Sequence, residues 1–320
     1  MLKKSTIIAL AGSLIIGGIG LSIAGVALGG KTQLSYGGIH QFFEQADASL
    51  ETIGYVDGNK KQNIIKKENS VISEKLGHFT RLDIEVGTIA LNVVEGEGYE
   101  IDIDIKSHVN LSYGVKGNTL HVKQKNESHL YQGGFNGSSD GSITITVPGA
   151  IKFEEIEIDL GVGMGLIEGI KTKELNIESG VGFVKIKQVI ADEVNISGGV
   201  GNLEINGLTS EKTKVEGGVG SIQVYDLKSS KLEASIGVGS VLIEGDIDGN
   251  INIEGGLGGL QLSLAGRESD YNYSIERGAG NIIINDTKQS GVGDVKVRNN
   301  AKYDVDISAG LGDIKIITKE

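Results

Sequence analysis

The chain has 320 residues, a formal net charge of −12, no cysteine, one proline and 50 glycines. The acidic balance argues against a nucleic-acid-binding protein, which would need a basic stripe, and the lack of cysteine excludes disulfides and thiolate metal sites. A collagen-like chain is also excluded, because the glycines follow no Gly-X-Y period and proline is nearly absent. The apolar residues are mainly Ile, Val and Leu, a β-branched bias that favours strands.

The first predicted element is a transmembrane anchor at residues 1–30. Lys3 and Lys4 precede an uncharged run over residues 5–30, and about 20 apolar residues suffice for a helix to cross a bilayer. Lysines before the run predict that the N-terminus stays inside the cell and that the C-terminal domain is extracytoplasmic. We therefore expect a single-pass protein of the cytoplasmic membrane, with the membrane as its partner through residues 5–30.

A cleaved signal peptide is the alternative interpretation of the same stretch. Its apolar core normally has about 7 to 15 residues and is followed by a small-x-small cleavage site. The uncharged run is longer than this, although Ser22 and Ala24 provide a weak site of that kind. The length of the run favours an uncleaved anchor.

Residues 31–76 are interpreted as a juxtamembrane spacer. Apolar residues recur at roughly helical spacing between Ile39 and Ile53, so a short amphipathic helix ending at Gly54 is expected here. The polar stretch 57–61 that follows is rich in turn residues. A solvated linker is favoured over a binding role.

Residues 77–320 are predicted to form an all-β domain. Apolar and polar residues alternate at 82–86, 89–93 and 101–105, and further strands are expected at 120–122 and 143–147. Alternation of this kind gives each strand one apolar face for a core and one polar face for solvent. The stretch between the last two strands is rich in Gly, Ser and Asn and is expected to be a long loop.

A tripeptide of the form Gly-apolar-Gly then recurs every 19 residues, starting at positions 161, 180, 199, 218, 237 and 256. A fixed period of this length predicts a solenoid in which each repeat is one coil stacked on the last. Two or three short faces per coil and strands about 4.8 Å apart describe a parallel β-solenoid. The predicted fold class is thus all-β, a single parallel β-solenoid of about 19-residue coils preceded by one N-terminal transmembrane helix.

The inward positions of one coil can be numbered from the central apolar residue of the tripeptide. Aliphatic residues recur at −6 and −4, at +3 and +5, and at +8. The positions that face inward are therefore even-numbered up to zero and odd-numbered at +3 and +5. Because a strand places alternate side chains on one face, this phase must change around the second glycine and again between +5 and +8. Glycine readily adopts the unusual backbone angles of such corners. Position −5 is polar and is expected to face solvent.

The glycines of the tripeptides are therefore predicted to be structural corner residues. The spacing slips to 22 and then 13 residues before 19 returns, which predicts one enlarged and one shortened coil near the C-terminal end. The predicted corner residues are Gly161, Gly163, Gly180, Gly182, Gly199, Gly201, Gly218, Gly220, Gly237, Gly239, Gly256, Gly258, Gly278, Gly280, Gly291, Gly293, Gly310 and Gly312.

Several short motifs indicate a family. Pro148-Gly149 follows the strand at 143–147, a Phe-Glu-Glu-Ile-Glu-Ile-Asp stretch begins at Phe153, and Ser-Gly-Val-Gly or Gly-Gly-Val-Gly units come next. Together with the terminal Gly-Leu-Gly-Asp-Ile-Lys-Ile from Gly310, these motifs resemble the bacterial putative-adhesin family of formerly unknown function, also called Toastrack domains, over roughly residues 78–320. The resemblance implies a β-strand-repeat fold, frequent anchoring in Gram-positive membranes and, for some members, a place beside envelope-stress regulators. It supplies no catalytic residues.

Neither a catalytic nor a ligand-binding constellation is expected. The stretch 161–165 is similar to a nucleotide-binding glycine loop, but that loop requires a strand-to-helix turn, and here the motif recurs between strands. Gly-x-Gly-Asp at 291–294 and 310–313 resembles calcium-binding β-roll repeats, but the period differs and a turn is favoured. Tyr271 and Tyr273 form a small aromatic patch in which Tyr273 falls at an inward position and is interpreted as core. We therefore predict no enzyme activity, no cofactor and no metal.

Three functions are compatible with this sequence. The favoured one is a membrane-anchored, extracytoplasmic, non-enzymatic scaffold or adhesion module of the cell envelope, with an envelope protein or wall polymer as its partner and no nucleic acid. The second is an accessory or sensory protein in the envelope-stress response, which the anchor and the family resemblance suggest. The third is a β-helix enzyme acting on polysaccharide, which rests on fold analogy alone.

Overall fold

The computed structural model of the chain describes residues 63–65, 70–125, 139–285, 287–290 and 293–319. The chain divides into two compact units, Met1–Gly54 and Tyr55–Glu320, and all the described residues belong to the second. The predicted anchor, its signal-peptide alternative and residues 31–62 and 66–69 of the predicted spacer lie outside the described residues, whereas the remainder of that segment contains the paired strands β1 (Asn63–Ile65) and β2 (Ser70–Lys75). Within the described ranges, no helix is both long and apolar enough to cross a membrane.

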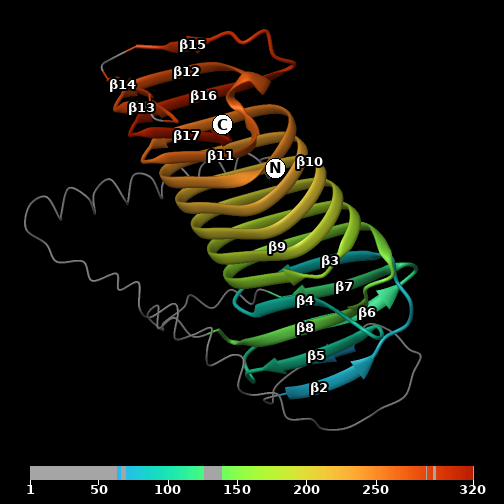
Figure 1. The fold of residues 1–320 in the computed structure, drawn as a ribbon. Helices are drawn as coiled ribbons and strands as arrows, with labels where there is room; N and C mark the ends of the chain where they lie inside the picture. Colours follow the sequence, from blue (N-terminus) through green and yellow to red (C-terminus); the bar gives the residue numbers. More distant parts are fainter. Residues whose placement is uncertain (1–62, 66–69, 126–138, 286, 291–292, 320) are drawn as a thin grey trace, which may run out of the picture. The chain divides into compact units, whose positions relative to one another are not determined.

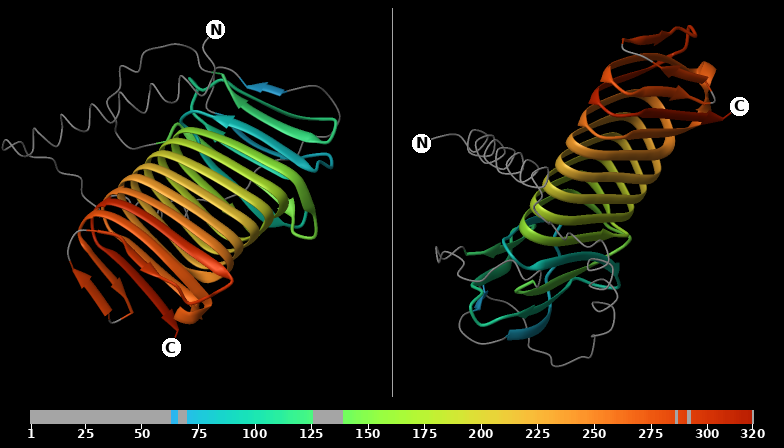
Figure 2. Two further views of the ribbon diagram at one scale, coloured as in Figure 1. Left: turned by 90° about the horizontal axis from the view of Figure 1, so that it is seen from above. Right: turned by 90° about the vertical axis from the view of Figure 1, so that its left-hand side faces the viewer.

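The second unit is a β-solenoid whose regular coils are formed by β9 (Lys152–Glu168) and the continuous strand β10 (Lys171–Leu257) (Figure 1). Each residue pairs in parallel with its equivalent one coil earlier, as Leu175 does with Ile156 and Ile186 does with Ile167. Figure 2 shows these coils as a regular stack between two less regular ends. The prediction of a parallel β-solenoid is confirmed for the described part of the chain.

The core of each regular coil consists of the aliphatic ladders expected from the repeat. Leu175 at −6, Ile186 at +5 and Leu208 at +8 each have an exposed fraction of 0%. Polar side chains at −5 point outward and stack, and Asn195 Nδ2 donates a hydrogen bond of 3.0 Å to Asn176 Oδ1 of the preceding coil. The stack therefore buries like residues against like residues, which is the main stabilising contribution expected for a solenoid.

The central residue of the tripeptide differs from the expectation. It was expected to face inward, but Val162 and Leu257 have exposed fractions of 43% and 47%. The inward residue of this region is instead at −2, where Leu160 and Ile236 are only 5% and 6% exposed. The chain thus turns at the first glycine of the tripeptide, earlier than predicted. The side chain of the central residue is therefore left on the outer side of the corner.

The second corner lies between +5 and +8, as the pattern predicted. Residues at +7 adopt a left-handed backbone in four successive coils, with φ of 73° at Gly169, 50° at Gln188, 75° at Gly207 and 52° at Asp226. A single left-handed residue reverses which face of the strand points inward, so the aliphatic side chain at +8 returns to the core.

At the N-terminal end, the first coil in sequence is not the first in the stack. Strand β3 pairs in parallel with both β7 and β9, and β4 pairs in parallel with both β8 and β9, so the coil β3–β4 lies between β9 and the coil β7–β8. Antiparallel strands β6, β5, β2 and β1 complete this end. These strands are β1 (Asn63–Ile65), β2 (Ser70–Lys75), β3 (Arg81–Val86), β4 (Ala90–Gly96), β5 (Glu100–Ile105), β6 (Leu111–Lys116), β7 (Thr119–Gln124) and β8 (Gly141–Pro148).

The C-terminal end is interleaved in the same way. Strand β16 pairs in parallel with β10 on one side and β12 on the other, while β17 pairs with β11 and β13 (Figure 1). The last coil in sequence is therefore inserted between two coils that precede it. The elements are β11 (Leu260–Arg267), the 3-10 helix η1 (Glu268–Asp270), β12 (Tyr271–Ala279), β13 (Asn281–Ile284), β14 (Thr287–Ser290), β15 (Val295–Val297), β16 (Tyr303–Leu311) and β17 (Ile314–Lys319).

The predicted shortened coil near residue 291 is wrong. Strand β14 runs antiparallel to β13, and β15 runs antiparallel to β12, so this segment returns along the outermost coil instead of forming another one. Gly291 lies outside the described residues, and Gly293 has no neighbour that a Cβ would approach within 4 Å. Short antiparallel strands are a common way to close the end of a parallel stack.

Candidate functional site

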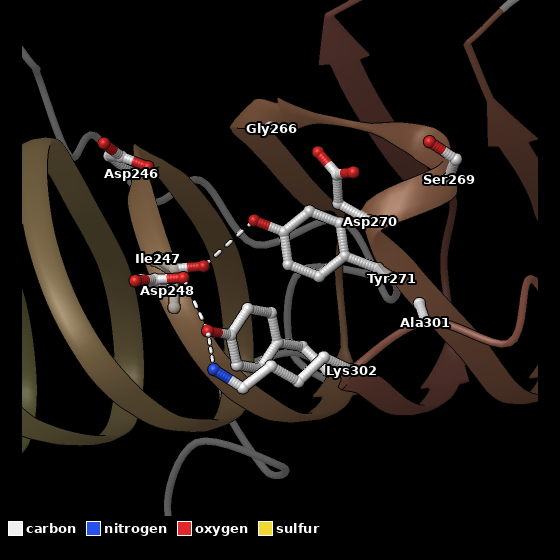
Figure 3. Close-up of a pocket in the computed structure, with 10 residues that line it drawn as sticks. Asp246, Ile247, Asp248, Gly266, Ser269, Asp270, Tyr271, Ala301 and Lys302 are labelled. Carbon is white, nitrogen blue, oxygen red and sulfur yellow. Dashed lines mark hydrogen bonds between the residues drawn. The ribbon is translucent and has the colours of Figure 1, made fainter.

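A hollow among the described residues lies at the C-terminal end of the stack, where the last coil is inserted. It is a cavity of about 380 Å³. Strand β10, the turn around η1 and the segment that leads into β16 each contribute to its wall (Figure 3). The lining residues are Asp246, Ile247, Asp248, Gly266, Ser269, Asp270, Tyr271, Ala301, Lys302 and Tyr303.

The cavity opens where the chain departs from its own repeat. Position +8 carries the buried residues Val189, Leu208 and Leu227 in three earlier coils, but in the next coil it carries Asp246, which is exposed. Gly245 at +7 lacks the left-handed backbone of the earlier coils, so Ile247 points inward with an exposed fraction of 1%. As a result, the side chains of Asp246 and Asp248, which flank Ile247, point away from the core and line the cavity.

Tyr271 forms one side of the cavity. Its ring is buried, with an exposed fraction of 3%, and its hydroxyl donates a hydrogen bond of 2.9 Å to the Ile247 carbonyl oxygen (Figure 3). Burial is the main cause that raises the pKa of Tyr271 to about 12, and the negative charges of Asp246, Asp270 and Asp248 contribute to this value. The hydroxyl therefore stays protonated at neutral pH and acts as a fixed donor.

Tyr303 forms the adjacent wall, with its ring centroid 6.4 Å from that of Tyr271. Its hydroxyl donates a hydrogen bond of 2.6 Å to Asp248 Oδ1 and accepts one of 2.8 Å from Lys302 Nζ. The ammonium of Lys302 also lies 4.6 Å from the centroid of the Tyr303 ring, a cation–π contact. The hydrogen bond from Lys302 to Tyr303 raises the pKa of the Lys302 ammonium.

The carboxylates of the cavity are unequally neutralised. Asp270 accepts a hydrogen bond of 2.9 Å from the Arg267 backbone N–H, and its Oδ1 lies 3.6 Å from Arg267 Nη2. Asp248 accepts only the Tyr303 hydroxyl, and Asp246 makes neither a hydrogen bond nor an ion pair with any described residue. Three aspartates thus line the cavity, and Lys302 is the one basic residue among its lining residues.

The sequence located this site only in part. The aromatic patch of Tyr271 and Tyr273 is present, and Tyr273 is core as interpreted, with an exposed fraction of 2% and a pKa raised by burial. The aspartates, Lys302 and Tyr303 were missed because they come together only through the inserted coil. The available signal was the replacement of an aliphatic residue by Asp246 at position +8 of the repeat.

The predicted corner glycines that the structure describes lie outside this cavity. In the regular coils, a Cβ on the first glycine of the tripeptide would meet a backbone carbonyl of the neighbouring coil, as Gly161 would at 2.7 Å from Gly87 O and Gly237 would at 2.7 Å from Gly218 O. The second glycine has a positive φ in five of the six regular tripeptides, for example 152° at Gly182, the exception being Gly163. The tripeptides therefore have a packing reason for glycine that involves no ligand.

Other chemistry has little support in the described part of the chain. It contains no group of three or more His, Cys, Asp or Glu side chains placed to hold a metal ion. One Gly-x-Ser-x-Gly sequence, the pattern of a hydrolase nucleophile elbow, occurs at 137–141. Its last glycine begins strand β8, whereas the elbow requires a strand-to-helix turn, so Ser139 does not have the setting of a nucleophile.

Comparison with known proteins identifies the family. The profile of the family described as Toastrack DUF4097 matches residues 79–317. The chain belongs to this family. The match confirms the resemblance inferred from the sequence, whereas a search of curated proteins finds no match.

Several solved structures are similar to this Toastrack chain. A putative adhesin from Bacteroides fragilis is 18% identical, with 81% of this chain and 98% of the other covered and a TM-score of 0.40. A putative cell adhesion protein from Clostridium sporogenes is 20% identical, with 81% and 99% covered and a TM-score of 0.27. A putative lipid binding protein from Parabacteroides distasonis is 15% identical, with 82% and 99% covered and a TM-score of 0.36. At TM-scores below 0.5, these likenesses carry no information on function.

Proposed function

We propose that this Toastrack chain is a membrane-anchored, extracytoplasmic and non-enzymatic adhesion or scaffold module of the cell envelope. The observation that carries the proposal is the cavity at the C-terminal end of the stack. Both tyrosine hydroxyls in its wall donate to fixed acceptors, Tyr271 to the Ile247 carbonyl and Tyr303 to Asp248. Groups held in this way favour the binding of a ligand over the transfer of a proton to it.

The solenoid suits a module that holds a binding site in a fixed position. Its coils share one continuous core, and every regular coil is hydrogen-bonded to its neighbours on both sides. Neither end of the regular stack is an open coil, because antiparallel strands pair with the outermost coils. A stack of this kind presents its end and its faces as preformed surfaces.

Anchoring in the membrane is the part of the proposal that rests on sequence alone. The uncharged run at 5–30 and the preceding lysines predict a single pass with the N-terminus inside. The test is protease accessibility of a C-terminal tag on intact cells of a bacterial host. We expect the tag to be removed from outside and the protein to remain with the membrane after a high-salt wash. A protected tag, or a protein released into the medium, would contradict the anchored topology.

The adhesion role is tested by sedimentation with envelope material. Purified full-length protein in a non-ionic detergent is mixed with isolated cell walls and, separately, with walls stripped of their accessory polymers. Saturable co-sedimentation with one of the two supports an envelope-binding module and identifies the component. Absence of binding to both, or release of soluble sugar from either, would overturn the proposal, and the second result would favour a polysaccharide-acting enzyme.

A further inference from the structure

We infer that the cavity at the C-terminal end binds a small organic cation through its ammonium group. The two tyrosine rings would contact the alkyl surface of the ligand, and the aspartates would face its charge. This inference deepens the proposed function by giving the chemistry of a ligand, and it rests on that proposal only in assigning the cavity a binding role.

The charge of the wall is the first argument. Asp246, Asp248 and Asp270 come from two separate segments, β10 and η1, yet all three act on the Tyr271 hydroxyl. Arg267 pairs with Asp270, and Lys302 donates its hydrogen bond to the Tyr303 hydroxyl, while its charge also acts on Asp248 from a longer distance. Asp246 and Asp248 thus have no basic partner within 4 Å among the described residues, and their combined field favours a cation in the hollow between them.

The contact between Lys302 and Tyr303 is the second argument. An ammonium group already lies 4.6 Å from the centroid of this ring, within the distance at which a cation is attracted to the face of an aromatic ring. The Tyr303 hydroxyl is oriented by Asp248 at 2.6 Å, so the ring is held in a fixed position. The contact of the Lys302 ammonium with the Tyr303 ring is therefore of the type that the ammonium of a ligand would make.

The departure from the repeat is the third argument. Three earlier coils place Val189, Leu208 and Leu227 in the core at position +8, and these residues have exposed fractions of 1% or less. Asp246 replaces this aliphatic residue in the coil that borders the cavity. Positions at which a sequence breaks its own structural rule are expected to be functional sites. The volume of about 380 Å³ lies in the range of small-molecule sites.

Choline is a suitable probe because its uncharged isostere, 3,3-dimethyl-1-butanol, has the same shape. We would titrate the full-length protein in a non-ionic detergent and follow the line width of the ligand methyl signal by NMR. Choline and n-propylammonium are expected to bind saturably and more weakly as salt is added, whereas the uncharged isostere is expected to bind at least about fivefold more weakly than choline. Equal binding of choline and its isostere, or no saturable binding of either ammonium probe, would overturn the inference.

Substitutions locate the site. Asp246→Asn and Asp248→Asn are expected to weaken choline binding at least about fivefold each, because each removes one counter-charge while keeping the shape of the side chain. Asp104→Asn is the matched control, since Asp104 is an exposed aspartate on β5, at the N-terminal end of the stack. Unchanged binding in the first two variants, or an equal loss in the control, would contradict the assignment.

A further outcome decides between an organic cation and a metal ion. Displacement of choline by calcium at constant ionic strength would show that the carboxylates prefer a divalent metal, and the organic cation would then be the wrong class. These titrations contain no cells or walls, so a negative result leaves the co-sedimentation test of the adhesion role unaffected. Circular dichroism of each variant before titration distinguishes loss of a contact from loss of the fold, and the comparison of choline with its isostere requires no variant.

Discussion

Gly180 lies against Gly161 of the neighbouring coil so closely that a Cβ on Gly180 would be 2.5 Å from the Gly161 carbonyl oxygen. Gly199 has the same relation to Gly180, and Gly237 has it to Gly218. The first glycines of the tripeptides thus form a column in which each backbone occupies the space that a side chain of the next coil would need. Their recurrence in the sequence follows from this contact.

The column predicts a difference between two adjacent glycines. Gly199→Ala is expected to lower the free energy of unfolding by about 2–4 kcal/mol, because its Cβ would collide with the Gly180 carbonyl oxygen and the coils would have to separate. Gly198→Ala is the control, since its Cβ would approach only Glu216 O, at 3.7 Å. We expect this variant to be unchanged or more stable by up to about 1 kcal/mol. Urea unfolding measures both, and an equal loss in the two would contradict the explanation.

A buried hydroxyl cluster gives the second prediction. Ser210 Oγ lies 2.6 Å from Thr213 Oγ1 and donates a hydrogen bond of 3.2 Å to Ser229 Oγ, inside a core that is otherwise aliphatic. Thr213→Val alone is expected to destabilise the protein by about 1–2 kcal/mol, because it leaves the serine hydroxyls without one partner. The triple variant Ser210→Ala, Thr213→Val, Ser229→Ala is expected to lose less than the sum of the three single changes. Additive losses in urea unfolding would show that the hydroxyls do not act as one network.

The third prediction concerns alkaline pH. In the unfolded chain the Tyr271 hydroxyl loses its proton near pH 10, whereas in the folded protein its pKa is raised to about 12. Between these values the unfolded state binds fewer protons, so its free energy falls relative to the folded state and stability decreases as pH rises. The contribution of Tyr271 is fully present below pH 10 and declines by about 1.4 kcal/mol per pH unit up to the folded pKa.

Unfolding by urea at a series of pH values between 9 and 12 tests this. The Tyr271→Phe variant is expected to lose stability less steeply above pH 10 than the unsubstituted protein, whatever its stability at pH 8. The absorbance of tyrosinate provides a second measurement, because the variant should have one late-ionising tyrosine fewer than the unsubstituted protein, while Tyr273 ionises late in both. Parallel pH dependences of the two proteins would contradict the raised pKa.

The inserted coil gives the fourth prediction. Removal of residues 303–320 deletes β16 and β17, which separate β12–β13 from β10–β11. Hydrogen exchange is expected to become fast at 271–284 and to stay slow in the regular coils, because β12 and β13 lose their parallel partners, whereas β10 and β11 remain paired with the rest of the stack. A synthetic peptide of residues 303–319 should restore protection when added. Unchanged protection at 271–284 after truncation would show that the outer coil does not depend on the inserted one.

Much of the regular solenoid could be predicted from the sequence, because a fixed period places equivalent residues in equivalent environments. Leu175, Ile186 and Leu208 were expected in the core and are buried. The orientation of Val162 was not predictable in the same way. Alternation along a strand shows that the phase changes near the tripeptide, but it does not show on which glycine the chain turns.

The ends and the cavity were less predictable, since they depend on pairing between distant segments. Tyr271 pairs with Tyr303, and nothing in the spacing of their repeats indicates that the later strand lies inside the earlier coil. The sequence indicated the aromatic residue Tyr271 but not its charged neighbours. Asp246 could have been noticed as an exception at position +8, yet its relation to Lys302 requires the inserted coil.

The insertion of β16 and β17 also bears on how the chain is made. Each regular coil pairs with the coil before it, so winding can follow synthesis as the chain emerges. The slot between β10–β11 and β12–β13 is filled by residues 303–319, which are synthesised after both of its walls. Until then the strand edges of the slot remain open to chaperones, proteases and other nascent copies. The C-terminal end, and the cavity beside it, can therefore form only after β16 and β17 have been synthesised.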